Sequence, residues 1–316
     1  MASAPEFDFI DRHFLPLAGP GALFLSDDAA VMTPPPGREL VLAADAVVSG
    51  VHFLPDDPAD TVGEKLLGVN LSDLAAMGAM PLGYLLTVSA PASLGDHWFA
   101  GFAAGLKHAQ ERFGLSLLGG DTTGTPGPLC LSLTILGHVA PGRALRRNGA
   151  RPGDAIWVTG TIGDAALGLM CLQNGLPDPT GFLVDRYRRP QPRLGLVLDG
   201  IASAAIDVSD GLVQDLGHLC RRSGVAAEIA AERVPASPAA RAAGTDLLER
   251  RLTGGDDYEL LLAVPPDREE ALLAESVRAG IAVTRIGVFR SGPPDVTLRD
   301  ASGAPLRFAR GGWSHF

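Results

Sequence analysis

The feature that most constrains the fold of this chain is the alternation of short apolar runs with amphipathic helical patterns, which occurs in both halves. We expect Asp96 to cap the second helix of the first half and Gly114 to end it. Strands that alternate with helices predict an α/β or α+β protein with layered sheets. The strands predicted in the first half are residues 41–48, 83–90 and 129–139, and the helices are 61–79 and 96–114.

The second half repeats this alternation after a basic passage rich in Gly and Pro. Residues 144–154 read ALRRNGARPGD, a composition typical of a domain junction. With 316 residues the chain is long enough for two domains, which we place at 1–146 and 147–316. The strands predicted in the second half are 155–160, 204–209, 258–265 and 284–289, and the helices are 164–175, 210–224 and 267–280.

The charge of the chain restricts its partners. The formal net charge is −10, and basic residues occur in nothing longer than pairs such as Arg221-Arg222. Because the phosphates of duplex nucleic acid would be repelled by this field, we expect no nucleic-acid partner. An acidic protein binds polyanions when metal ions lie between the two.

The sequence also predicts a soluble, cytoplasmic protein. Its first residues, MASAPEFDFIDRHF, carry acids where a secretory signal carries bases, and no apolar run approaches the ~20 residues of a bilayer span. No membrane partner is expected. The three cysteines, Cys130, Cys171 and Cys220, are odd in number and widely spaced. We therefore expect reduced core thiols, and neither disulfides nor a zinc site.

Aspartates recur beside glycine or serine at the ends of apolar runs. Any one of them has an ordinary explanation, because Ser-Asp pairs cap helices and Gly-Gly-Asp is common in turns. Six such places in one chain are better explained by a shared function. The residues are Asp27 and Asp28, Asp45, Asp73, Asp121, Asp207 and Asp210, and Asp256 and Asp257.

A shared site for magnesium explains these aspartates together. Strand ends in layered α/β folds gather at one edge, which is where ligands bind. Carboxylates that converge there raise one another's pKa unless cations intervene. Mg²⁺ prefers oxygen ligands and takes carboxylates together with substrate phosphates, whereas zinc favours His and Cys. The pattern predicts several magnesium ions that bridge a polyphosphate.

The usual nucleotide signatures are missing from the sequence. The two lysines, Lys65 and Lys107, do not follow a glycine-rich loop, so there is no P-loop, and the loop set of protein kinases is absent. Residues 158–168 (VTGTIGDAALG) superficially resemble a dinucleotide turn, but no acidic residue follows at the expected distance, and a tight turn before a helix is the simpler reading.

Taken together, the motifs resemble the thiamine-monophosphate kinase family, among the aminoimidazole ribonucleotide synthetase-like ATP enzymes. The matching stretches include SDDAAV, ADAVVSGVHF, GVNLSDLAAMGAMP, LLGGDTTG, IDVSDGLVQDLGHL, GGDDYELLLAVP and the terminal GGWSHF. They occur in family order along the whole chain. The resemblance implies an N-terminal mixed-sheet domain (1–146) for dimerisation, metal and substrate, and a C-terminal α/β domain (147–316) that covers an ATP cleft. It also implies a homodimer.

The resemblance implies ATP as co-substrate, several Mg²⁺ ions, and direct in-line transfer of the γ-phosphoryl group to thiamine monophosphate. The metal ligands that it implies are Asp28, Asp45, Asp73, Asp121, Asp207 and Asp210, with Ala43 and Ala44 able to contribute only through their backbone. The ATP contacts that it implies are Gly120, Asp121, Arg147 and Ser209, and the substrate contacts are His52, Glu259 and Trp313.

The chemistry fits these residue types. Phosphoryl transfer depends mainly on alignment and charge neutralisation. The acceptor is itself a phosphate ester with a second pKa of about 6, so it is largely ionised at neutral pH and needs no general base. Trp313 offers an aromatic face to the cationic thiazolium ring. Arg147 suits a phosphate oxygen, although the neighbouring Arg146 is an alternative, and Glu259 in YELLL reads equally as an exposed strand residue.

Two departures from the family pattern affect the metal count. Ala43 and Ala44 stand where family members usually carry Thr or Ser, and Ser26 replaces a common glycine. These changes are also the only support for a nucleotide-binding module that has lost catalysis. Other superfamily activities lack their marker residues, since the first cysteine is Cys130, the chain ends in Trp-Ser-His-Phe, and AVVSGVHF contains no lysine.

Overall fold

A computed structural model of the protein describes residues 5–314. The chain divides into two compact units, Met1–Leu74 with Ala79–Gly142 and Ala75–Gly78 with Arg143–Phe316. The second unit is therefore built from two separate stretches of chain. Both units combine a β-sheet with helices, as the alternation in the sequence predicts.

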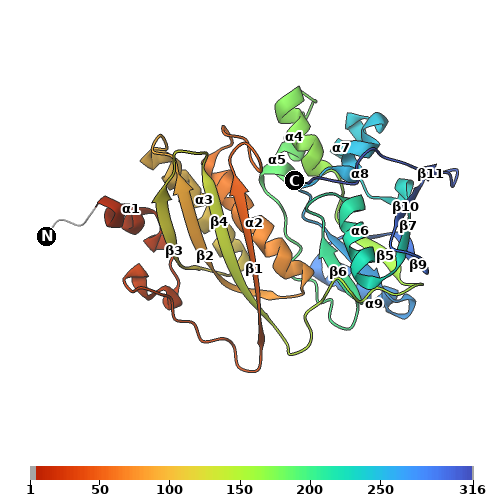
Figure 1. Ribbon diagram of the computed structural model, residues 1–316, viewed down its shortest axis with the longest axis horizontal. Helices are drawn as coiled ribbons and strands as arrows, with labels where there is room; N and C mark the ends of the chain where they lie inside the picture. Colours follow the sequence, from red (N-terminus) through yellow and green to blue (C-terminus); the bar gives the residue numbers. More distant parts are fainter. Residues whose placement is uncertain (1–4, 315–316) are drawn as a thin grey trace. The chain divides into compact units, whose positions relative to one another are not determined.

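The first unit contains a four-stranded mixed sheet in the order β1-β4-β2-β3 (Figure 1). β4 runs antiparallel to both of its neighbours, whereas β2 and β3 are parallel. The elements are α1 (Pro5–His13), η1 (Leu15–Leu17), η2 (Pro20–Leu25), β1 (Glu39–Val48), α2 (Ala59–Ala76), β2 (Met80–Ala90), α3 (Asp96–Phe113), β3 (Leu117–Gly124) and β4 (Cys130–Val139).

Helices α2 and α3 cover one face of this sheet (Figure 1). Burial alternates strictly along β4, where Leu131, Leu133 and Ile135 are fully buried. The helices pack closely through glycines, since a Cβ at Gly105 would lie 1.9 Å from the backbone oxygen of Asp60. The period-2 pattern of the strands thus separates a packed face from an open one.

The opposite face of the four-stranded sheet carries exposed apolar side chains. Leu42 is 61% exposed, Met80 58% and Leu85 41%. Leu42 pairs with Leu136 across β1 and β4, which puts both side chains on this face. His138 on β4 lies in the same rows, and its Nδ1 is buried without a hydrogen-bond partner among the described residues. An apolar face of this kind is typical of a protein interface.

The second unit contains a seven-stranded sheet in the order β11-β10-β7-β9-β5-β8-β6. Its strands are β5 (Ala155–Thr159), β6 (Ala204–Asp207), β7 (Ala226–Ala230), β8 (Leu260–Val264), β9 (Val283–Arg290), β10 (Val296–Arg299) and β11 (Pro305–Leu306). Its helices are α4 (Asp164–Asn174), α5 (Phe182–Arg188), α6 (Leu212–Ser223), α7 (Pro238–Ala243), α8 (Leu248–Thr253) and α9 (Glu269–Ala279), with η3 (Ala231–Arg233), η4 (Thr245–Leu247) and η5 (Pro266–Arg268).

Apolar side chains pack on both sides of this sheet. On one side, Leu216 and Leu219 of α6 join a core with strand residues such as Ile206 and Ile286. On the other side, Leu272 of α9 packs with Trp157 of β5 and with alternate residues of β8. Because β5 and β8 are covered on both faces, their residues are buried in continuous runs.

All the strands and helices predicted from the sequence are present, and the α/β class is confirmed. The predicted and observed ends of these elements differ by up to three residues. The sequence missed strands β3, β7, β10 and β11, because they are short or rich in glycine, alanine and polar residues, and it missed the short helices α1, α5, α7 and α8. The prediction that Asp96 caps α3 is wrong: the N-cap is Gly95, and Asp96 is the first helical residue. Gly114 ends α3 in the left-handed conformation, as expected (φ 72°).

No helix within residues 5–314 is long and apolar enough to cross a membrane. The three cysteines are free, and Cys220 lies in the core of the second unit. Cys130 and Cys171 are half-buried.

Candidate functional site

In the first unit, Asp45 lies on the open edge of the sheet. β1 pairs only with β4, and the backbone N–H of Asp45 donates to Oδ1 of Asn70 in α2 (3.1 Å). Asn70 is fully buried and donates its own amide to the Leu66 carbonyl (2.9 Å). Its side chain therefore fixes β1 to α2 at the position of the aspartate, a contact that the sequence reasoning missed.

This contact also shows that the carbonyls of the two alanines that precede Asp45 point in opposite directions. In an antiparallel pair, the N–H and C=O of one residue point to the same side, and this side alternates along the strand. Since the N–H of Asp45 points away from β4, the carbonyl of Ala43 does so too, whereas that of Ala44 points toward Thr134 of β4. Ala43 is therefore the alanine whose carbonyl points away from the neighbouring strand.

Asp73 lies inside helix α2, one turn beyond Asn70. The prediction that an aspartate stands at the end of each apolar run is therefore wrong here, and Ser72-Asp73 does not cap a helix. The apolar residues around it belong to a buried helix, not to a strand, and a helix interior positions the side chain firmly. Asp73 is half-buried.

Asp121 lies within β3, on the face opposite to that of Asp45. The register pairs Asp121 with Thr87, whereas Asp45 pairs with Leu133, and Leu133 pairs with Leu86 in the buried row. β1 and β3 are the two edge strands of the sheet, so at ~4.8 Å per strand the two aspartates are about 14 Å apart. Both lie inside their strands, not at strand ends, and the unit does not bring them together.

Gly120 has a structural role that is independent of any ligand. A Cβ at this position would lie 1.7 Å from the carbonyl oxygen of Leu86 on the neighbouring strand. Only glycine allows β2 and β3 to approach this closely.

Asp28 follows an unusual loop, and His52 lies in a tight turn. Leu23, Phe24 and Leu25 all have positive φ (50°, 58° and 53°), a conformation that side chains disfavour, directly before the exposed Ser26-Asp27-Asp28 segment. His52 follows β1, and its Nδ1 accepts the backbone N–H of Val48 (3.0 Å). This hydrogen bond fixes the orientation of the imidazole ring.

In the second unit, a carboxylate that the sequence reasoning missed organises the Ser-Asp-Gly loop. Oδ2 of Asp215 accepts the backbone N–H groups of Ser209, Asp210 and Gly211 at 3.1, 3.0 and 3.1 Å. This loop follows Asp207, the last residue of β6, and leads into α6. The spacing Asp-Gly-x-x-x-Asp, with the second acid in the first helical turn, is the signal that could have identified Asp215.

The segment Gly255–Glu259 pairs with this loop in a strained conformation. Asp256 and Tyr258 have positive φ values (71° and 50°), which L-residues adopt at a cost. The backbone N–H of Asp256 donates to the Ser209 carbonyl (2.9 Å) and that of Tyr258 to the Val208 carbonyl (2.8 Å). The strain is therefore held by hydrogen bonds to the segment that carries Asp207 and Asp210.

Two acids of this segment are fully buried. Oδ2 of Asp257 accepts the backbone N–H of Gly163 (2.7 Å) at the start of α4. Burial raises the pKa of Asp257 well above its ordinary value. Glu259 accepts the Thr159 hydroxyl (2.7 Å), Nη2 of Arg186 (2.9 Å) and both Nε (2.5 Å) and Nη2 of Arg193. Glu259 has no exposed surface, so the reading of it as an exposed strand residue is wrong.

Charged groups crowd around the Ser-Asp-Gly loop. Burial raises the pKa of Asp215 to about 8, and the charges of Asp207 and Asp210 add to this effect. Asp210, Asp215 and His218 each offer an atom within 4.8 Å of the others. Burial, followed by the charges of Arg221 and Arg147, lowers the pKa of His218. The charge of Arg147 thus acts on His218 of α6.

The C-terminal tail docks on the same loop. The backbone N–H of Trp313 donates to the Asp210 carbonyl (3.0 Å). Gln214 Nε2 donates both to Oδ2 of Asp210 (3.0 Å) and to the Trp313 carbonyl (2.5 Å). Trp313 as a whole is 54% exposed.

The second unit therefore brings Asp207, Ser209, Asp210, Arg147 and Trp313 to one place. The donor set is suited to Mg²⁺, since carboxylates predominate, and after burial the charges of Asp207 and Asp210 contribute to the raised pKa of Asp215. His218 was missed by the sequence reasoning, although its position three residues after Asp215 on α6 puts both on one helix face.

Comparison with known proteins shows the family. Residues 26–139 match the N-terminal domain of AIR synthase related proteins, and residues 151–298 match their C-terminal domain. The thiamine-monophosphate kinase of Caulobacter vibrioides is 43% identical over 99% of this chain and 92% of its own length. That of Salmonella typhimurium is 42% identical over 92% of this chain and 91% of its own.

Solved structures agree with the sequence relatives. The thiamine-monophosphate kinase of Stenotrophomonas maltophilia superposes with a TM-score of 0.81 at 42% identity, over 87% of this chain and 89% of the other. A structure described as AaThiL complexed with AMPPCP and TMP has a TM-score of 0.78 at 31% identity, over 100% of this chain and 99% of the other. The hydrogenase maturation protein HypE, at 19–22% identity, shares the fold. With two-domain similarity along nearly its whole length, this chain belongs to the thiamine-monophosphate kinase family.

Proposed function

We propose that this protein transfers the γ-phosphoryl group of ATP to the phosphate of thiamine monophosphate, forming thiamine diphosphate and ADP. The observation that carries the proposal is similarity over 100% of this chain to a structure that holds an ATP analogue and TMP, together with 43% identity to a thiamine-monophosphate kinase. A relative that has lost catalysis would lose the aspartates of the motifs first, and this chain has all of them.

Several Mg²⁺ ions are part of the proposal. When bound, they neutralise the two phosphorylated reactants so that these can approach each other in line. The ligands proposed are Asp28, Asp45, Asp73, Asp121, Asp207 and Asp210, with the carbonyl of Ala43 in preference to that of Ala44. Because Asp45 and Asp121 face opposite sides of their sheet, we propose that they serve different ions.

The roles of the other residues follow from their chemistry. Arg147, Ser209 and Gly120 are proposed to contact ATP, and the effect of the Arg147 charge on His218, which lies close to Asp210, favours Arg147 over Arg146. The exposed indole of Trp313 is proposed to stack on the thiazolium ring, with His52 on the substrate phosphate. No residue is needed as a general base, since the acceptor phosphate is already ionised at neutral pH.

The predicted contact of Glu259 with thiamine monophosphate stays a prediction. Its carboxylate is fully buried, and both oxygens already accept hydrogen bonds from arginines. We propose that it acts on the substrate indirectly, by holding the segment that leads back to Asp256 and the Ser-Asp-Gly loop.

We also propose a homodimer, formed through the open face of the four-stranded sheet in the domain at residues 1–146. Exposed Leu42, Met80 and Leu85 support an apolar interface there. The domain at residues 147–316 is proposed to cover ATP. A cytoplasmic location is proposed on the three free cysteines, which persist in a reducing compartment.

The proposal is tested by measuring product formation from ATP, Mg²⁺ and one of three acceptors: thiamine, thiamine monophosphate or aminoimidazole precursors. Of the three acceptors, only thiamine monophosphate should give thiamine diphosphate. Asp45→Asn and Asp121→Asn should each lower turnover by orders of magnitude, because each removes a metal ligand, whereas the exposed Asp56→Asn should not. ATP binding without product in the wild type would favour the inactive module. Trp313→Ala should chiefly raise the KM for thiamine monophosphate.

A further inference from the structure

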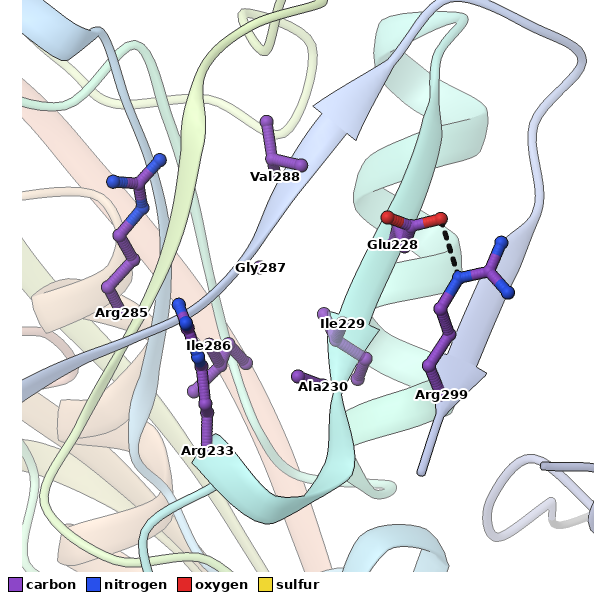
Figure 2. A pocket seen from close by; sticks show the side chains of 9 residues that line it. All are labelled: Glu228, Ile229, Ala230, Arg233, Arg285, Ile286, Gly287, Val288 and Arg299. Atoms are coloured by element: carbon purple, nitrogen blue, oxygen red, sulfur yellow. Dashed lines mark hydrogen bonds and ion pairs between the residues drawn. The ribbon is translucent and has the colours of Figure 1, made fainter. Parts of the chain in front are cut away.

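The second unit has a cavity of about 270 Å³ that the proposed reaction does not use (Figure 2). It lies over β7 and β9, and β10 contributes Arg299. In the sheet order these strands stand on the far side of β5 and β8 from β6, the strand that ends in Asp207. The cavity is therefore separate from the Ser-Asp-Gly loop.

The position of helix α9 explains why a hollow forms here. Leu272 of α9 packs against Trp157 of β5 and the alternate residues of β8, which share one face of the sheet. On β7 and β10 the same face carries charged side chains instead. Ile229 and Leu298 point into the core on the opposite face. Their chain neighbours Glu228 and Arg299 therefore point to the face on which α9 lies. The sheet surface beside α9 is thus polar and open.

Three of the nine residues that line the cavity are arginines. Arg233 at the end of η3 and Arg285 at the start of β9 stand at one end, and the ion pair of Glu228 with Arg299 stands at the other (Figure 2). Arg299 Nε lies 2.8 Å from Oε2 of Glu228. Gly287, between the arginines and the ion pair, contributes no side chain that would fill the hollow.

The ion pairs of these residues neutralise only part of the positive charge around the cavity. Glu228 also meets Arg290 (Nη2 to Oε1, 3.5 Å), and Arg285 meets Glu269 of α9 (Nη1 to Oε1, 3.5 Å). Arg233 is exposed and makes no side-chain hydrogen bond or ion pair with any residue in 5–314. Among the lining residues themselves, three arginines stand against one glutamate, an excess of two positive charges, in a protein whose net charge is −10.

We propose that this cavity binds a small phosphorylated anion through Arg233 and Arg285. A guanidinium presents paired N–H donors that match the oxygens of a phosphate group. A phosphate monoester is largely a dianion at pH 7, since its second pKa is about 6, and this matches the excess of two charges. The volume lies just below the ~300–1,000 Å³ of drug-sized ligand sites, so the occupant has few atoms.

Titration calorimetry with inorganic pyrophosphate tests the proposal on the full-length protein, in EDTA so that the magnesium-dependent active site does not take up the probe. We expect one binding event in the wild type. Arg233→Ala should weaken it at least tenfold, and Arg233→Lys should recover part of the loss. The control Arg38→Ala removes an equally exposed arginine from the first unit and should leave the affinity unchanged.

Amide chemical shifts locate the probe. Pyrophosphate should move the signals of Gly287 and Ile229, which line the cavity, and not those of Ser209 and Asp210. Equal affinity in the wild type and Arg233→Ala, or equal weakening by Arg38→Ala, would overturn the proposal. Shifts confined to the Ser-Asp-Gly loop would do so as well. So would shifts at Gly287 with an oligoglutamate peptide and none with pyrophosphate, since that result indicates an acidic protein partner.

Discussion

Replacement of Glu259 by glutamine removes a single negative charge from a fully buried site. In the wild type this carboxylate is bonded to Arg186 and Arg193, whose side chains are only 7% and 22% exposed, and to the Thr159 hydroxyl. In the wild type, Nη1 of Arg186 already has no hydrogen-bond partner among the described residues. The glutamine amide keeps the size of the side chain but leaves both guanidinium groups without a counter-charge.

The cost follows from the burial of these groups. Loss of one partner from a buried ion pair destabilises a protein by about 3–5 kcal/mol, because the remaining charge stays desolvated. In a domain of about 150–250 residues, each kcal/mol lowers Tm by about 2–4 °C, so we expect a fall of about 6–20 °C. Glu270→Gln on α9, an exposed glutamate without a side-chain partner among residues 5–314, should change Tm by less than about 2 °C.

Differential scanning calorimetry of the two variants and the wild type measures this difference directly. Because the chain has two units, the transition of the second unit must be followed separately, for example through Trp157 in its core. Combining Glu259→Gln with Arg186→Leu should cost less than the sum of the two single variants, since one stranded charge is then absent.

Kinetics separate the two readings of Glu259. At a temperature well below the transition, the KM of Glu259→Gln for thiamine monophosphate should stay within a few-fold of the wild-type value. An unchanged Tm together with a large increase in this KM would refute the reasoning, and would mean that the carboxylate contacts the substrate.

Three further substitutions follow from contacts described above. Gly120→Ala should destabilise the first unit by about 1–3 kcal/mol or more in urea unfolding, because its Cβ would lie 1.7 Å from a β2 carbonyl, whereas Gly119→Ala, with its nearest contact at 3.6 Å, should be tolerated. Asp215→Ala leaves three backbone N–H groups without an acceptor and should lower kcat at least tenfold, with partial recovery in Asp215→Asn; equal activity of both variants and the wild type would contradict this. The hydrogen bond from His13 lowers the pKa of Asp96 in the folded state, so its contribution to stability is present above the unfolded pKa of about 3.9 and disappears as pH falls through the folded value. The Tm difference between the wild type and Asp96→Asn should therefore shrink between pH 5 and pH ~3, and a constant difference would contradict the assignment.

The sequence predicted the class and most elements because apolar periodicity is strong in this chain. Strands such as 129–139 alternate perfectly, and helices such as 96–114 end in a glycine that adopts the left-handed conformation. β3 was harder to recognise, since Leu-Leu-Gly-Gly-Asp-Thr-Thr-Gly combines strand and turn residues. Of its glycines, Gly120 is explained by close strand packing, a tertiary effect that local patterns do not contain.

The sequence pattern predicted the positions of the candidate site residues in the fold only in part. Asp207 ends a strand as expected, but Asp45 and Asp121 lie within strands and Asp73 within a helix. Which face of a sheet a residue occupies depends on register, and register is set by pairing between distant segments. The same limit applies to Asn70, which accepts the backbone N–H group of Asp45 from a distant segment, whereas the contacts of Asp215 are local and its spacing from Asp210 was a usable signal.

The discontinuity of the second unit constrains how this protein can be made. Ala75 and Ala76 belong to a core that also contains Leu145 and Leu262, so the ribosome releases one edge of that core before it synthesises residues 79–142. The core closes only when β8 has emerged, long after its first part. A fragment that begins at the sequence junction would lack this early piece, and the shortest fragment able to complete both cores runs continuously from before residue 75.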